Sequence, residues 1–373
     1  MAWGSPRVLD IVYQSQQITV PEWVSLWTLC LAPLVAHIVA RTPPPSYLTH
    51  KRPRWHDYLA LYNPISVVWR YAAIFDRRLH TLNWGPSDMA AANAIFWTDK
   101  GWDGSEEMVA QSIKYCASLP RSSRASVISG EFVKTVIVTL QGIQAIYIFT
   151  GSLNGTTKMP RFAVDTALSP IAFLGLVRLP VAFWLTSEYA FASPMSSSSA
   201  GDNAPLLART SDKTAPASEE DGENKPLKGI FAEENQHAAR RRPIFRAFFI
   251  TPVIILWVIT LMFLIPGPLQ GKKYQDGRIF SLNVFLETVF SAVYCFMFIA
   301  VYTYCAWRYD FRSTIIPCIS SPWYKLLAVL SVVGFIPVLV VSALGTRRTI
   351  CGVYTTLGTD RDAELCAPYL PTQ

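Results

Sequence analysis

The chain has 373 residues, of which 51% are hydrophobic and 16% are charged, and its formal net charge is +7. Soluble domains carry about 25% charged residues, and several apolar stretches here exceed the length of about 18 residues that indicates a membrane span, so the composition excludes an ordinary soluble protein. The positive charge does not indicate nucleic acid as a partner, because Lys and Arg collect in the cytoplasmic loops of membrane proteins. The Cys and His residues show no ligand spacing, so no metal or other cofactor is expected.

The apolar stretches predict an all-α fold: a polytopic helical membrane protein with about six transmembrane helices and a helical cytosolic insert. The predicted segments are a short outer N-terminus (1–20), the first span (21–40), the insert (41–131), the second and third spans (132–192), a disordered cytosolic linker (193–243), the fourth to sixth spans (244–345) and an outer tail (346–373). The last five spans centre on 132–150, 164–191, 247–265, 283–306 and 326–344.

The insert is expected to contain short helices. Asn63 followed by Pro64 is a typical helix start, with Asn as the cap and Pro in the first turn. Apolar residues follow at helical spacing and three arginines lie on or near the other side, so an amphipathic helix near 64–80 is predicted, either on the membrane surface or against the bundle. Further helices are expected at about 87–97 and from Ser105, whose hydroxyl is placed to cap its helix.

The third span is unusual for a membrane helix. It carries Arg178 near its middle, between Pro170 and Pro180. An arginine at the bilayer centre costs about 2.5–3.5 kcal/mol on an insertion scale, and proline removes a backbone hydrogen bond that lipid cannot replace. This stretch is therefore expected to need protein neighbours, and whether it spans the bilayer fully is left open.

Polar residues in neighbouring spans are the expected partners of Arg178. Counting residues along the helices places Arg178 near the midplane and Glu287, in the fifth span, toward the outer edge, so the two are predicted to pair. Gln141 and Gln144 of the second span share one broad face and are expected to assist. The four residues form either a site for a substrate or ion, or a structural contact between spans.

The linker contains the one motif that resembles a known signal. Asp202, followed after three intervening residues by Leu206 and Leu207, is similar to the acidic dileucine signals that adaptor complexes recognise on cytosolic tails. The resemblance implies an adaptor complex as a partner, in addition to the lipid bilayer. It also implies residence in the secretory pathway, in endosomal or vacuolar membranes or in the plasma membrane.

The distribution of Lys and Arg predicts that the insert and the linker face the cytosol and that both termini face outward. Two features fit this orientation. Asn154 begins the sequence Asn-Gly-Thr, a glycosylation acceptor, in a loop placed outside. Cys351 and Cys366 lie in the outer tail, where an oxidising compartment favours a disulfide; the alternative is that the tail is unstructured.

No catalytic signature is found in the sequence, so an enzyme is not favoured. The first hypothesis is transport of a small solute or ion, because the third span is broken by proline and carries a buried charge. The alternative is a non-catalytic membrane scaffold or accessory subunit, and an enzyme acting on lipid ranks third. The substrate, the partners and the oligomeric state do not follow from the sequence.

The predicted orientation is tested with reporter tags. A tag placed within 196–223 is expected to be accessible from the cytosol. Tags at either terminus are expected to be accessible from outside the cell or from the lumen. The physical reason is the excess of Lys and Arg in the loops assigned to the cytosol. A lumenal tag within 196–223 would reverse the orientation and remove the basis for a sorting signal.

Overall fold

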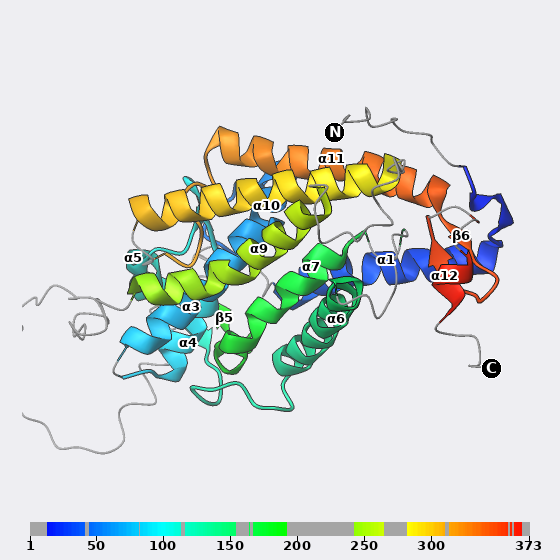
Figure 1. The fold of residues 1–373 in the computed structure, drawn as a ribbon. Coiled ribbons are helices and arrows are strands. Elements are labelled where there is room, and N and C mark those ends of the chain that lie inside the picture. Colours follow the sequence, from blue (N-terminus) through cyan, green and yellow to red (C-terminus); the bar gives the residue numbers. More distant parts are fainter. Residues whose placement is uncertain are drawn as a thin grey trace, which may run out of the picture.

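The computed structural model describes residues 13–41, 45–81, 83–112, 116–153, 164, 167–191, 242–264, 282–309, 313–356, 359 and 362–367. The described chain is mostly helical (Figure 1), which confirms the predicted helical class. Four helices are long and apolar enough to cross a membrane, namely α1 (Val20–Arg41), α9 (Arg242–Leu264), α10 (Leu282–Arg308) and α11 (Pro322–Gly345). They are consistent with a membrane protein, while the count of six spans stays a prediction.

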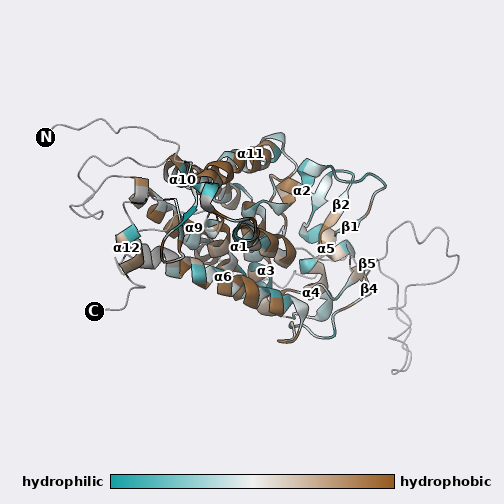
Figure 2. Cartoon of the chain, turned by 90° about the vertical axis from the view of Figure 1, so that its right-hand side faces the viewer, coloured by the Kyte–Doolittle hydropathy of each residue, from teal (hydrophilic) through white to brown (hydrophobic). Residues whose placement is uncertain are grey.

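The helices α9, α10 and α11 form one layer, in which α10 lies between the other two (Figure 1). Their outward faces carry large apolar side chains that are about half exposed, such as Phe296, Leu330 and Ile336. Figure 2 shows hydrophobic residues concentrated on these long helices and more hydrophilic ones on the insert. A continuous apolar surface of this kind is unfavourable in water and is expected where helices face lipid.

The third predicted span is shorter and tighter than expected. It is preceded by α6 (Gly130–Leu153) and consists of α7 (Ser169–Leu174) and the 3₁₀ helix η4 (Gly175–Trp184). A 3₁₀ helix rises about 2.0 Å per residue and an α-helix 1.5 Å, so these 16 residues reach about 29 Å, close to the hydrocarbon thickness of about 30 Å. The predicted helix over 164–191 was therefore too long, but the segment remains long enough to extend along the bundle.

Close contact between α6 and the α7–η4 segment depends on two glycines. A Cβ atom at Gly175 would lie 2.8 Å from the carbonyl oxygen of Val138, and one at Gly142 would lie 2.6 Å from Cγ of Leu176. Small residues at helix contacts let backbones approach closely, as in other membrane helices. These two positions therefore fix how near the two segments can lie.

The described residues of the insert form four helices and four short strands. The helices are α2 (Trp55–Tyr62), α3 (Pro64–His80), α4 (Pro86–Asn93) and α5 (Glu106–Ser112). The strands β1 (Ser46–Tyr47), β2 (Phe96–Thr98) and β3 (Gly101–Asp103) form a sheet in that order, with β1 parallel and β3 antiparallel to β2. A fourth strand, β4 (Cys116–Ser118), pairs with β5 (Ala190–Phe191), which follows η4.

Two of the predicted helix starts are confirmed. Asn63 caps α3, because its side-chain oxygen accepts a hydrogen bond of 3.0 Å from the N–H of Ile65. The hydroxyl of Ser105 accepts a hydrogen bond of 3.2 Å from the N–H of Met108 at the start of α5. The helix expected over 87–97 ends earlier, at Asn93, because the following aromatic residues enter β2 and pair with β3 instead.

The amphipathic helix predicted near 64–80 was given two alternative positions, on the membrane surface or against the bundle, and the first is wrong. Thirteen of the 17 residues of α3 are buried, and the helix packs against η4, α9 and α10, so it lies inside the bundle and not on the membrane surface. The arginines expected to face water are buried as well: Arg70 donates to the carbonyl oxygen of Asn93, and Arg77 donates to that of Gly104. Backbone carbonyls of the insert thus replace water around both side chains.

At the end of the bundle away from the insert lie the described segments nearest the two termini (Figure 1). These segments contain η1 (Ser15–Gln17), β6 (Arg347–Arg348), β7 (Tyr354–Thr355) and α12 (Asp362–Cys366). Arg348 pairs with Glu22 of α1 at 2.6 Å, and a disulfide joins Cys351 to Cys366. The described part of the tail is therefore structured, and both described ends lie at one end of the molecule, away from the insert.

The close approach at Gly175 generates a prediction about stability. Gly175→Ala is expected to lower the melting temperature of the purified protein in detergent, with a cost of about 1–3 kcal/mol, because the added methyl group overlaps the backbone of α6. Gly130→Ala is the matched control, since a Cβ atom there would meet nothing within 4 Å. Equal melting temperatures for the two variants would contradict the close contact.

Candidate functional site

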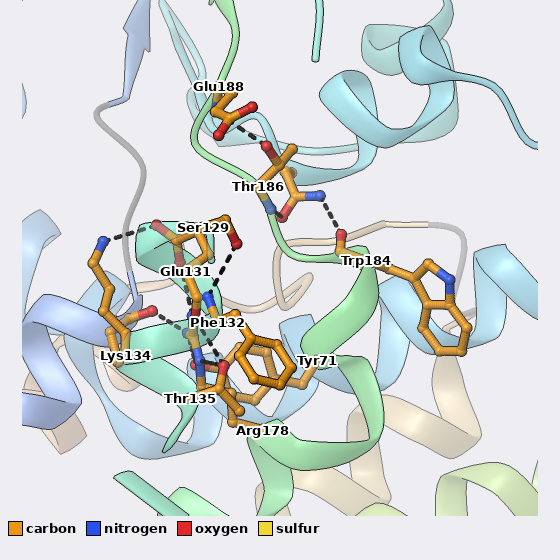
Figure 3. Close-up of polar contacts among 12 residues, drawn as sticks. Tyr71, Ser129, Glu131, Phe132, Lys134, Thr135, Arg178, Trp184, Thr186 and Glu188 are labelled. Atoms are coloured by element: carbon orange, nitrogen blue, oxygen red, sulfur yellow. Dashed lines mark hydrogen bonds and ion pairs between the residues drawn. The ribbon is translucent and has the colours of Figure 1, made fainter. Parts of the chain in front are cut away.

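Arg178 lies on η4 and is almost completely buried, with 1% of its surface exposed. Its Nε donates to the hydroxyl of Thr135 at 2.8 Å, and its Nη2 donates to the carboxylate of Glu131 at 2.7 Å and to the carbonyl oxygen of the same residue at 3.2 Å (Figure 3). Its Nη1 donates to the hydroxyl of Tyr71 at 3.0 Å and to the carbonyl oxygen of Ala40. The five N–H donors of a guanidinium are thus all used by the protein.

The partners of Arg178 come from three other elements and compensate its charge. Ala40 belongs to the last turn of α1, where carbonyl groups have no partner in the helix and carry a partial negative charge. Glu131 lies in the first turn of α6, where an acidic residue is favourable, and it also pairs with Lys134 at 2.7 Å. The guanidinium therefore joins α1, α3, α6 and η4 at one point.

The predicted pair of Arg178 and Glu287 is wrong, because Arg178 pairs with Glu131 instead. The error lay in the predicted depth of Arg178 in the membrane. Counting along one continuous α-helix placed Arg178 at mid-membrane, whereas the structure places it beside Ala40 in the last turn of α1 and Glu131 in the first turn of α6. Arg178 thus lies near one end of the bundle.

The other predicted members of the site are not brought together either. Gln141 lines a space of only about 20 Å³ beside Arg178, too small to hold a substrate. Gln144 is exposed on α6, about 60° around the helix from the half-buried Gln141. The predicted glycosylation and sorting residues, Asn154, Asp202, Leu206 and Leu207, lie outside the described residues.

A larger cavity lies in the interior of the bundle. Its volume is about 310 Å³, and it is lined by parts of α1, α2, α3, α7, α9, α10 and α11. Most of its lining is apolar, including Leu174, Val253, Leu256, Phe290, Phe298 and Phe335. On α10 it extends from Glu287 to Phe298, about 16 Å along the helix axis. Glu287 is therefore a cavity residue, but of a different site from that of Arg178.

The cavity contains the start of α3. Asn63 lines it, and the amide oxygen of Asn63 accepts hydrogen bonds from the N–H of Ile65 and, at 3.2 Å, from the hydroxyl of Tyr294 in the middle of α10. The positive end of α3 is thereby held inside an apolar space, where its partial charge is poorly screened. Sequence reasoning identified Asn63 only as a cap and missed its position in the bundle.

Asp57, in the first turn of α2, links this helix to α11. Its carboxylate accepts a hydrogen bond of 2.8 Å from the N–H of Arg54 and pairs with Lys325, at the start of α11, at 2.7 Å. Burial acts to raise the pKa of Asp57, but the hydrogen bonds from Lys325 and from the N–H of Arg54 outweigh it, so the pKa lies below its ordinary value. The ionised carboxylate therefore ties α2, and with it the start of α3, to α11.

Among the described residues, no group of three or more His, Cys, Asp or Glu side chains is placed to hold a metal ion. Comparison with models of protein families, with curated proteins and with solved structures finds no match to this chain. The geometry of the cavity is thus the remaining source of functional information.

A double-mutant cycle tests the role of Arg178. Arg178→Leu is expected to cost about 3–5 kcal/mol of stability, because it removes five hydrogen bonds and leaves Glu131 buried with Lys134 as its remaining counter-ion. Combination with Glu131→Gln is expected to be strongly non-additive, whereas combination with Glu287→Gln is expected to be additive within about 0.5 kcal/mol. Thermal unfolding in detergent measures both. Coupling of Arg178 to Glu287 instead would restore the pairing predicted from sequence.

Proposed function

We propose that this protein is a multi-pass membrane protein that binds a small, largely apolar solute in the interior cavity and transports it across a membrane of the secretory pathway or the cell surface. The observation that carries the proposal is the start of α3 inside the cavity. Helix ends that point into a binding space near mid-membrane are typical of transporter sites. The cavity volume, about 310 Å³, falls in the range of small-molecule sites.

The nature of the proposed solute follows from the lining. The walls are mainly apolar side chains, and no Lys or Arg is among the described residues that line the cavity. A bare metal ion or a multiply charged metabolite would lose its hydration there without adequate compensation. Arg178 gives no support to an ion pathway, because its donors are all occupied by the protein.

The alternative function is that of a non-catalytic scaffold or accessory subunit. The observation that favours it is the attachment of the insert to the other helices through Arg178, which donates to Tyr71 of α3, and through Asp57 of α2, which pairs with Lys325 of α11. Such an attachment would let the insert present a fixed surface to another protein. Under this alternative the cavity would be filled by lipid and its shape would not matter for activity.

Filling the cavity distinguishes the two functions. Ala328 lines the cavity from α11, so Ala328→Phe is expected to abolish binding of apolar small molecules to the purified protein, measured by native mass spectrometry, and to abolish their flux in proteoliposomes. Val340→Phe is the matched control, because Val340 lies on the same helix with half of its surface exposed. It is expected to leave both binding and flux unchanged.

Two results would contradict the proposed function. The first is that the unmodified protein binds no member of a broad panel of apolar solutes. The second is that Ala328→Phe binds and transports them as well as the unmodified protein does. Either result would favour the scaffold, whose activity depends on the surface of the insert.

A further inference from the structure

The loop 119–129, between β4 and α6, has an unusual turn at its tip. The N–H of Ser129 donates to the carbonyl oxygen of Ser126 at 2.9 Å, which closes a β-turn with Val127 and Ile128 as its two central residues. These two residues are 61% and 91% exposed. Gly, Pro, Asn, Asp and Ser dominate in turns, whereas β-branched apolar residues are unfavourable at an exposed tip. Their presence indicates that the tip contacts an apolar medium rather than water.

This turn lies at the boundary of the apolar part of the bundle. The contacts of Arg178 place the first turn of α6 level with the last turn of α1. From that level onward the outer face of α6 is apolar, and Val136, Leu140 and Ile143 are each about half exposed on it. The tip of the turn therefore lies at the depth where a leaflet changes from hydrocarbon to headgroups.

The loop is attached to the end of η4, beside an exposed aromatic ring. The N–H of Ala125 donates to the carbonyl oxygen of Phe183 at 2.7 Å, and the rings of Phe183 and Phe132 lie 5.8 Å apart. Phe183 is 47% exposed. The loop thus lies next to an apolar surface that an acyl chain would cover.

Arg121 and Arg124 bring positive charge to the same loop. Both are exposed, and neither guanidinium forms a hydrogen bond or ion pair within the part of the chain that the structure describes. Together with Ser122, Ser126 and Ser129 they line a polar cleft of about 710 Å³. Their N–H groups are therefore available to the oxygens of a phosphate or a carboxylate.

Two acidic residues of the same cleft limit its positive charge. Glu131 is compensated, since it pairs with Arg178 and with Lys134, each at 2.7 Å (Figure 3). Glu188 is exposed and forms no ion pair among the described residues, so it leaves one acceptor for a cationic group. Two available guanidinium groups and one available carboxylate favour a ligand with two negative groups and one positive group.

We propose that this loop binds a phospholipid of the phosphatidylserine type in the leaflet at the insert end of the bundle. Arg121 and Arg124 bind the phosphate and carboxylate of the headgroup, Glu188 binds its ammonium group, and Val127 and Ile128 contact the acyl chains. The predicted orientation makes this the cytosolic leaflet, which carries the anionic lipids. The inference is independent of the interior cavity, because none of these five residues lines it.

Removal of the two charges tests the assignment. Arg121→Gln combined with Arg124→Gln is expected to weaken binding of dioctanoyl phosphatidylserine to the purified full-length protein about thirtyfold, or about fivefold for each arginine. Binding of dioctanoyl phosphatidylcholine, which has no net charge, is expected to change little. Native mass spectrometry from detergent measures both affinities. Lys51→Gln combined with Lys100→Gln is the matched control, since it removes the same charge from exposed positions elsewhere on the insert, and it is expected to bind both lipids normally.

A second pair of changes tests contact with the acyl chains. Val127→Ser combined with Ile128→Ser is expected to weaken binding of both lipids to the same degree, and so to keep the preference for phosphatidylserine. Free phosphoserine, which has the headgroup without the chains, is expected not to displace the lipid at equal concentration.

Three results would overturn the assignment. The first is that the unmodified protein binds the two lipids equally well. The second is that the protein without Arg121 and Arg124 keeps the full preference for phosphatidylserine. The third is that phosphoserine competes as well as the intact lipid does, which would show a site for a soluble anion and not for a membrane lipid. The altered side chains are exposed, so the melting temperature without added lipid is expected to be unchanged.

Discussion

The arrangement of the helices depends on one guanidinium, that of Arg178, whose five N–H groups all donate hydrogen bonds within the protein. Arg178 would be costly in an apolar interior, and the chain compensates it with the end of α1, the start of α6 and the side of α3. Because these partners lie far apart in the sequence, the same contact sets the position of each helix relative to the others. The place of α3 within the bundle, and hence the cavity at its start, follows from that contact.

The long apolar helices could be predicted from sequence because exposure to lipid is a property of composition. The starts of α3 and α5 could be predicted because a cap acts within three residues, as at Asn63 and Ser105. The short strands could not, since two or three residues carry no periodic pattern. The interior position of α3 was also missed, because arginines that bind backbone carbonyls look the same in sequence as arginines that face water.

The candidate site was also predicted only in part. Sequence reasoning recognised that Arg178 needs partners and that Glu287 lies among buried residues, since an ionised group in an apolar stretch is conspicuous. Which acid meets which base depends on how the helices are offset along the bundle and rotated about their axes, and neither follows from counting residues within one stretch. Asn63 carries two roles on one oxygen: it acts locally as the cap of α3, and it accepts a hydrogen bond from Tyr294 of the distant α10 beside the cavity.

The 3₁₀ geometry of η4 also constrains the length of the chain. With three residues per turn, Gly175, Arg178 and Val181 stack in one row, which places the close contact with α6, the guanidinium and a buried apolar side chain on a single ridge. In an α-helix the same residues would drift by about 60° at each step. One inserted or deleted residue between Gly175 and Arg178 would rotate the guanidinium by about a third of a turn, away from all of its acceptors. This stretch should therefore accept changes of side chain far more readily than changes of length.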